Sequence, residues 1–135
     1  VQISKHRMDV TFTEISETIA LSAMYAANHL EGIKAIITLT ESGYTAKLMS
    51  RITSSQPIYA LSRHQKTLNK MALYRGVYPA FFDSTALNGQ SLADAAIEAI
   101  KLKAGLKAGD LVIMTHGDVM ETIGASNTCK IVQVK

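Results

Sequence analysis

The 135 residues match the length of one ordinary domain, and 47% hydrophobic against 19% charged residues is the composition of a packed core, not of a disordered segment. Fourteen Lys and Arg against eleven Asp and Glu leave a net charge of only +3, spread along the chain, which argues against a dedicated nucleic-acid-binding surface. The single cysteine, Cys129, excludes an internal disulfide and is typical of a cytoplasmic protein. The longest nearly apolar stretch, residues 19–27, is shorter than the roughly 20 residues that cross a membrane.

The chain opens on a polar segment without an initiator methionine or the apolar centre of a signal peptide. We interpret residues 1–12 as an interdomain segment or polar leader within a longer protein. Residues 13–135 show no internal boundary and are predicted to form a single α/β domain.

The first half of that domain alternates helical and strand patterns. Apolar residues at near-helical spacing predict a helix over 13–30, and the β-branched run 35–39 predicts a strand buried on both faces. The turn 40–43 follows, and a second helical pattern covers 45–52.

The same alternation continues through the middle of the chain. Residues 57–61 predict a strand, and 65–75 predict a helix closed by Gly76 as its C-terminal cap. Residues 77–82 predict a third strand.

The last third contains one helix and two strands. The pattern at 91–94 is a capping box that predicts a helix beginning there and ending near 104. Residues 111–115 and 131–134 predict the last two strands, which no helix separates. We therefore expect a five-stranded, mostly parallel sheet flanked by helices on both faces, with the last strand antiparallel at an edge.

Ligands of open α/β sheets bind beyond the carboxyl ends of the parallel strands. After the first strand, four hydroxyl residues surround Gly43 directly before a helix, a setting that favours one phosphate group: Thr38, Thr40, Ser42 and Thr45. Neither the Walker nor the dinucleotide glycine spacing is present, and the same hydroxyls also fit simple helix caps.

The connection 115–128 is long for a compact domain, and such loops are usually functional or disordered. It carries small polar residues able to wrap a phosphorylated ligand. The chain shows neither metal-ligand spacing among its histidines nor a complete catalytic constellation.

Several motifs together resemble the C-terminal domain of pyruvate kinase. They are TLTESG (38–43), ALSR (60–63), ALYRGV (72–77), GDLVI (109–113) and SNT (126–128), with SKHRMDV (4–10) and SAMYAAN (22–28) most similar to the bacterial branch activated by nucleoside and sugar monophosphates. The resemblance covers essentially the whole chain in order and spacing.

The resemblance implies that a separate (β/α)8 barrel, outside these residues, transfers a phosphoryl group from phosphoenolpyruvate to ADP with Mg²⁺ and K⁺. The fragment itself would be inactive, hold no cofactor, bind a phosphorylated effector such as AMP or a sugar monophosphate, and pair with its own copy towards a tetramer. The effector-binding residues carried over are Thr38, Thr40, Glu41, Ser42, Gly43, Tyr44, Thr45, Arg63, Gly117, Gly124, Ala125, Ser126 and Asn127.

One position departs from the family pattern. Tyr44 stands where many relatives carry a basic residue, so a charge-assisted phosphate contact is missing there. Arg63, Lys47 or backbone N–H groups are the candidates to replace it, and Tyr44 is a candidate to stack on a sugar or base. Two other functions stay open: a free-standing binding module for sugar phosphates or nucleotides, and a pure oligomerisation domain.

Overall fold

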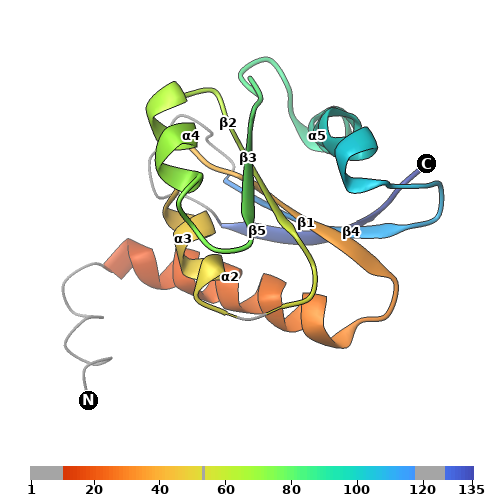
Figure 1. The fold of residues 1–135 in the computed structure, drawn as a ribbon, viewed down its shortest axis with the longest axis horizontal. Helices are drawn as coiled ribbons and strands as arrows, with labels where there is room; N and C mark the ends of the chain where they lie inside the picture. Colours follow the sequence, from red (N-terminus) through yellow and green to blue (C-terminus); the bar gives the residue numbers. More distant parts are fainter. Residues whose placement is uncertain (1–10, 53, 118–126) are drawn as a thin grey trace.

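The computed structural model describes residues 11–52, 54–117 and 127–135. Alternating helices and strands build a sheet with helices on both faces (Figure 1). The elements, in chain order, are α2 (Thr11–His29), β1 (Ile33–Leu39), α3 (Tyr44–Ser50), β2 (Ile58–Ser62), α4 (Gln65–Met71), β3 (Val77–Phe81), α5 (Gly89–Ala104), β4 (Leu111–His116) and β5 (Thr128–Gln133). Of the predicted leader, residues 1–10 lie outside the described residues, and Thr11 and Phe12 belong to α2.

The sheet has the strand order β3-β2-β1-β4-β5. Strands β1 to β4 run parallel, and β5 pairs antiparallel with β4 at the edge, which confirms the predicted fold class. From β1 the chain adds β2 and then β3 on one side, and it then returns to add β4 on the other side of β1. This change of side creates the crevice at the carboxyl ends of β1 and β4 where open α/β sheets bind ligands.

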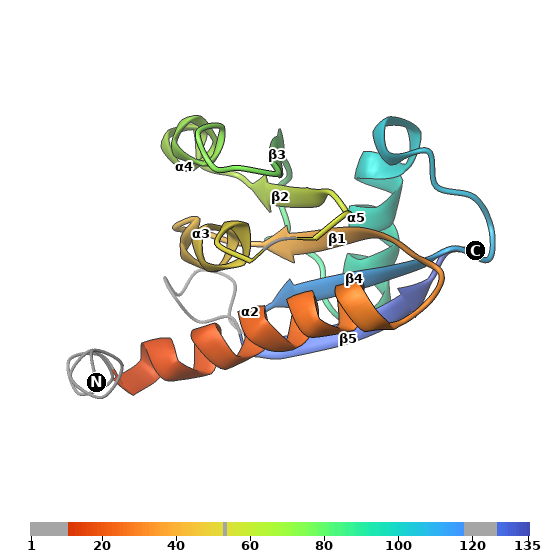
Figure 2. The same cartoon turned by 60° about the horizontal axis from the view of Figure 1, so that its bottom comes forward.

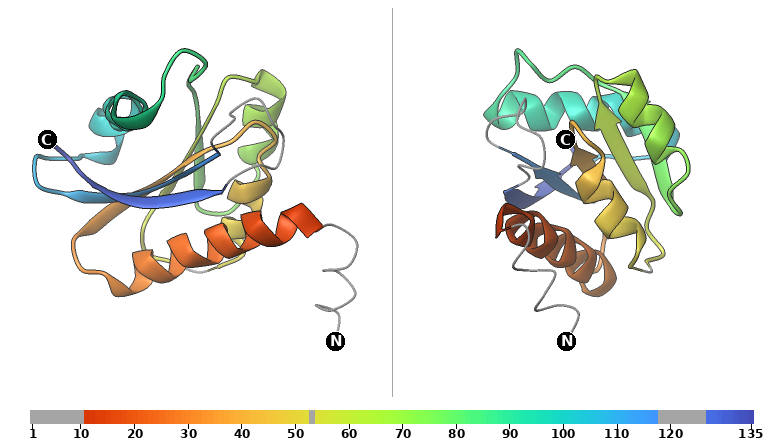
Figure 3. Two further views of the ribbon diagram at one scale, coloured as in Figure 1. Left: turned by 180° about the vertical axis from the view of Figure 1, so that it is seen from behind. Right: turned by 90° about the vertical axis from the view of Figure 1, so that its left-hand side faces the viewer.

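Each face of the sheet has its own apolar core. Helices α2, α3 and α4 pack on one face around Ile36 and Ile113, while α5 covers the other around Ile37 and Met114. Figure 2 shows α2 in front of β4 and β5 with α5 behind, and Figure 3 shows α2 and α5 on opposite sides. The central strands are buried on both faces, which explains why their sequences are largely apolar.

Each of the four predicted helices begins or ends a few residues away from its predicted bounds, and the largest difference is at the end of α4. Helix α4 ends at Met71 and not at Arg75, because Leu73 and Tyr74 donate to carbonyls only three residues back, and such tight turns replace the α-helical pattern. Ala72 is the C-terminal cap, and Gly76, at φ +75°, lies in the turn into β3.

The capping box of α5 lies three residues earlier than predicted. The Asn88 N–H donates to the Ser91 hydroxyl over 3.4 Å, and that hydroxyl donates back to the Asn88 carbonyl over 2.6 Å. Ser91 is therefore inside the first turn of the helix and not its cap. Within the described part of the chain, no helix combines the length and apolar character that a membrane span requires.

Candidate functional site

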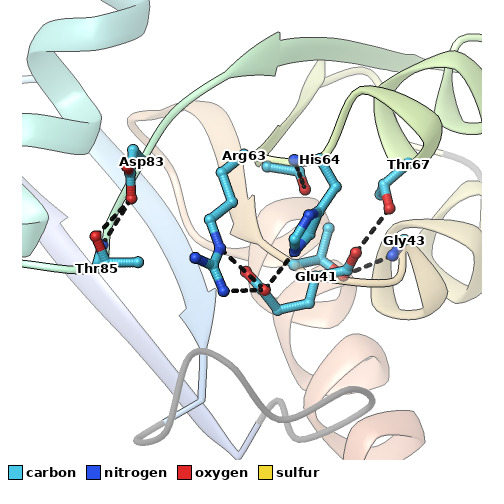
Figure 4. A network of polar contacts seen from close by, with 9 residues as sticks. Glu41, Gly43, Arg63, His64, Thr67, Asp83 and Thr85 are labelled. Carbon is cyan, nitrogen blue, oxygen red and sulfur yellow. Dashed lines mark hydrogen bonds and ion pairs between the residues drawn. The ribbon is translucent and has the colours of Figure 1, made fainter.

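The carboxyl ends of the four parallel strands meet at one edge of the sheet. The segment after β1 supplies Thr40 to Gly43, the segment after β2 supplies Arg63 and His64, and the segment after β3 supplies Asp83 and Thr85 (Figure 4). Residues distant in sequence are thus brought together at the ends of β1, β2 and β3, on the side of β1 away from β4.

Thr38 lies beneath this edge, inside the core. It pairs with Thr115 in the β1–β4 register, and the Thr115 hydroxyl donates to the Thr38 hydroxyl over 2.9 Å. Both side chains are fully buried. This hydrogen bond ties β1 to β4 directly below the crevice.

The turn after β1 is held by its own hydroxyls. The Gly43 N–H donates to Thr40 Oγ1 over 2.8 Å, and the Tyr44 N–H donates to Ser42 Oγ over 3.2 Å. Gly43 has φ +83°, a left-handed conformation that L-residues rarely adopt. Thr38, Thr40 and Thr45 are buried, so of the four predicted hydroxyl residues only Ser42 is partly exposed.

Glu41 joins the turn to β2 and α4. Its Oε1 accepts from Arg63 Nε at 3.3 Å and Nη2 at 3.2 Å, and lies 2.7 Å from His64 Nε2. Thr67 Oγ1 donates to the Glu41 carbonyl over 2.7 Å. Figure 4 shows Arg63 and His64 converging on this one carboxylate.

An open groove of about 660 Å³ runs along this cluster. It is lined by Glu41, Ser42, Arg63, His64, Lys66, Thr67 and Lys70. The lining holds three basic side chains, Arg63, Lys66 and Lys70, and one acid, Glu41, so the groove favours an anionic ligand.

Asp83 lies close to Arg63 at the end of β3 (Figure 4). Its Oδ1 accepts from the Thr85 N–H at 3.0 Å and from the Thr85 hydroxyl at 2.8 Å. These hydrogen bonds, with a smaller contribution from the Arg63 charge, hold the pKa of Asp83 below its ordinary value. Asp83 therefore stays ionised at neutral pH and fixes the loop that follows β3.

The second predicted loop is described only at its two ends. Gly117 is buried, Asn127 is exposed, and the Asn127 N–H donates to the His116 carbonyl over 3.1 Å. The predicted residues Gly124, Ala125 and Ser126 lie outside the described residues.

His116 is a buried polar residue at the end of β4. Its Nδ1 contacts the Gly117 carbonyl at 3.0 Å, so Nδ1 carries the proton, and Nε2 has no hydrogen-bond partner among the described residues. Across residues 11–52, 54–117 and 127–135, no three His, Cys, Asp or Glu side chains gather where a metal ion could be held.

The sequence pattern missed the contribution of α4. Lys66, Thr67 and Lys70 line the groove, and the only signal for the two lysines was their spacing of four residues directly after the second strand. Tyr44, a candidate for stacking on a ligand, is half-buried and packs against the apolar cluster shared by α2, α3 and α4. Lys47 is exposed on α3.

The family described as pyruvate kinase, alpha/beta domain, matches residues 17–132. The chain is 56% identical over 135 residues to pyruvate kinase II of Salmonella typhimurium and 48% identical over 130 residues to the pyruvate kinase of Haemophilus influenzae. The Salmonella match includes 100% of this chain but only 28% of the relative, and the Haemophilus match includes 96% of this chain but only 27% of the relative. A crystal structure of Cryptosporidium parvum pyruvate kinase matches 90% of this chain and 22% of its own, with a TM-score of 0.74 and 30% identity.

Proposed function

The chain belongs to the pyruvate kinase α/β domain family, and on that premise we propose that it is the effector-binding domain of a pyruvate kinase. The chain spans just over a quarter of the curated relatives it matches. In this proposal the longer protein transfers a phosphoryl group from phosphoenolpyruvate to ADP. This chain performs no chemistry itself and binds a phosphorylated metabolite.

The observation that carries the proposal is the basic groove beside the turn after β1. It places Arg63, Lys66 and Lys70 around one opening next to the Ser42 hydroxyl. Guanidinium and ammonium groups are the usual protein ligands of phosphate, and hydroxyls add hydrogen bonds to its oxygens. The ligand class that fits is a phosphate monoester, of which AMP and sugar monophosphates are the candidates.

Thermal unfolding tests this proposal with AMP, ribose 5-phosphate, glucose 6-phosphate and fructose 1,6-bisphosphate, and with inorganic phosphate and ribose as references. A ligand at about 100 times its dissociation constant stabilises the folded chain by about 2.7 kcal/mol. We expect one phosphorylated metabolite to raise the unfolding midpoint. The Lys66→Gln/Lys70→Gln variant should lose most of that rise, because two phosphate-facing charges are removed.

The matched control is Lys101→Gln/Lys103→Gln, which removes the same charge from the last turn of α5 on the opposite face of the sheet. It should keep the full rise. A rise that survives the α4 substitutions would place the ligand elsewhere, and no rise with any of the metabolites would contradict the proposal.

A specific surface favours a second role, pairing with another copy of the chain. Helix α2 exposes Ile15 by 54%, Leu21 by 55% and Tyr25 by 67%, and edge strand β5 exposes Ile131 by 50%. A groove of about 520 Å³ lies beside Tyr25 on this helix, lined largely by apolar atoms. Leu21 and Tyr25 are one helical turn apart and line this groove, and an exposed apolar patch of this kind is typical of an interface between protein chains.

Sedimentation velocity tests this second role. We expect the chain to sediment as a dimer and Leu21→Glu to make it a monomer, because a charge would be buried without a partner. Leu102→Glu is the control, since Leu102 is 96% exposed on α5 and away from the α2 surface. Sedimentation of the unsubstituted chain as a monomer at all concentrations would rule out pairing through this surface alone.

A further inference from the structure

We propose that the Glu41 carboxylate is an internal competitor for the phosphate group, an inference that rests on the proposed function of the groove. In the ligand-free chain the Glu41 carboxylate contacts the two basic side chains nearest the turn, Arg63 and His64. A bound phosphate must then compete with Glu41 for the Arg63 charge, so this acid lowers the affinity of the groove for the phosphate.

The geometry places three donors on one oxygen. Arg63 Nε and Nη2 lie 3.3 and 3.2 Å from Glu41 Oε1, and His64 Nε2 lies 2.7 Å from the same atom. The Glu41 side chain is only 7% exposed, whereas Arg63 is 29% and His64 is 47% exposed. The acid therefore lies beneath its two partners, and both partners are open to the groove.

The carboxylate and the phosphate compete for the charge of Arg63. Arg63 presents its Nε and Nη2 to Glu41, so a phosphate on that edge displaces the carboxylate, and a phosphate on Nη1 shares a charge that Glu41 already neutralises. A phosphate that takes Arg63 leaves a largely buried carboxylate with less compensation, and this penalty weakens binding of the ligand. Among the described residues Lys66 and Lys70 form no ion pair, so they are the cations that meet an incoming phosphate first.

The backbone at Glu41 is anchored independently of its side chain. Thr67 Oγ1 donates to the Glu41 carbonyl over 2.7 Å, and the Gly43 N–H donates to Thr40 Oγ1 over 2.8 Å. A substitution of the carboxylate alone therefore leaves the turn in place. Glu41→Gln keeps the shape of the side chain and removes its charge.

Isothermal titration with ribose 5-phosphate, inorganic phosphate and ribose tests the proposal. We expect Glu41→Gln to bind ribose 5-phosphate about tenfold more tightly than the unsubstituted chain, which corresponds to about 1.4 kcal/mol. Inorganic phosphate should tighten in the same direction, and ribose should not respond. The gain should fall below about twofold in an Arg63→Gln background, because no guanidinium is then left to release.

Two further variants control the experiment. Glu98→Gln makes the same charge change on α5, across the sheet, and should alter the affinity less than about twofold. Should Glu41→Gln fail to fold, Glu41→Asp shortens the acid so that it no longer reaches both bases, and it should also tighten binding.

The outcomes separate this inference from the proposed function. Unchanged or weaker binding by Glu41→Gln, in a chain that does bind ribose 5-phosphate, overturns the competition and leaves the phosphate site standing. An equal gain in the Arg63→Gln background also overturns it, because the effect would then be only the loss of a nearby negative charge. If neither the unsubstituted chain nor any variant binds ribose 5-phosphate, both the proposed phosphate site and the proposed competition are wrong.

Discussion

Replacing Ile113 with alanine is expected to lower the free energy of unfolding by about 3 to 4 kcal/mol. Ile113 lies in the middle of β4, is fully buried, and packs in the cluster that joins α2, α3 and α4 to the sheet. Removing three carbon atoms there costs their transfer out of water and leaves a cavity that the central strands cannot close. Urea unfolding followed by circular dichroism measures the loss.

The sheet itself supplies the matched control. Ile131 on β5 pairs with Ile113 in the antiparallel register but is 50% exposed. Ile131→Ala should therefore cost less than about 1 kcal/mol, provided that both variants are measured at concentrations where the chain is monomeric. Equal losses at the two positions would contradict the placement of the core.

Replacing Gly43 with alanine is expected to destabilise the chain by about 2 to 3 kcal/mol, with two separable causes. The first is the left-handed backbone at φ +83°, which costs an L-residue about 1 to 2 kcal/mol. The second is crowding, because a Cβ at this position would lie 3.0 Å from Met71 Cγ. Met71 is fully buried, so its side chain has little room to move away.

Gly76→Ala isolates the first cause. Gly76 has φ +75°, and a Cβ there would meet nothing within 4 Å. It should cost only the backbone term, about 1 to 2 kcal/mol. Thermal unfolding of both variants gives the difference, and a loss at Gly76 equal to that at Gly43 would show that contact with Met71 does not limit the turn.

The strands could be predicted because burial leaves a direct mark on their sequences. Buried on both faces, β1, β2 and β4 each have a short apolar run: residues 35–37 in β1, 58–61 in β2 and 111–114 in β4. Helix ends carry a weaker mark. Residues 72–75 are mostly good helix formers, yet the N–H groups of Leu73 and Tyr74 bond to carbonyls three residues back as the chain turns into β3. The position of β3 in the sheet sets this turn, and local helix propensity does not predict it.

The candidate site was predicted in outline and not in its contacts. The hydroxyl-bearing turn and Arg63 fall at the carboxyl edge, as the sheet topology requires. Thr38 is at that edge too, but its side chain faces Thr115 in the core because side chains alternate along a strand. The pairing of Glu41 with Arg63 spans 22 positions in sequence, and no local pattern signals such a contact.

The central claim is that a phosphorylated metabolite binds in the groove between the turn after β1 and α4. The most direct test is a ¹⁵N–¹H correlation NMR titration of the chain with ribose 5-phosphate and AMP. The claim predicts that the amides of Ser42, Gly43, His64 and Lys66 shift with one saturation curve, while those of Gly105 and Gly109, before β4 at the opposite edge, stay fixed. Shifts confined to α2 or to residues 105–111, or no shifts at saturating ligand, would contradict it.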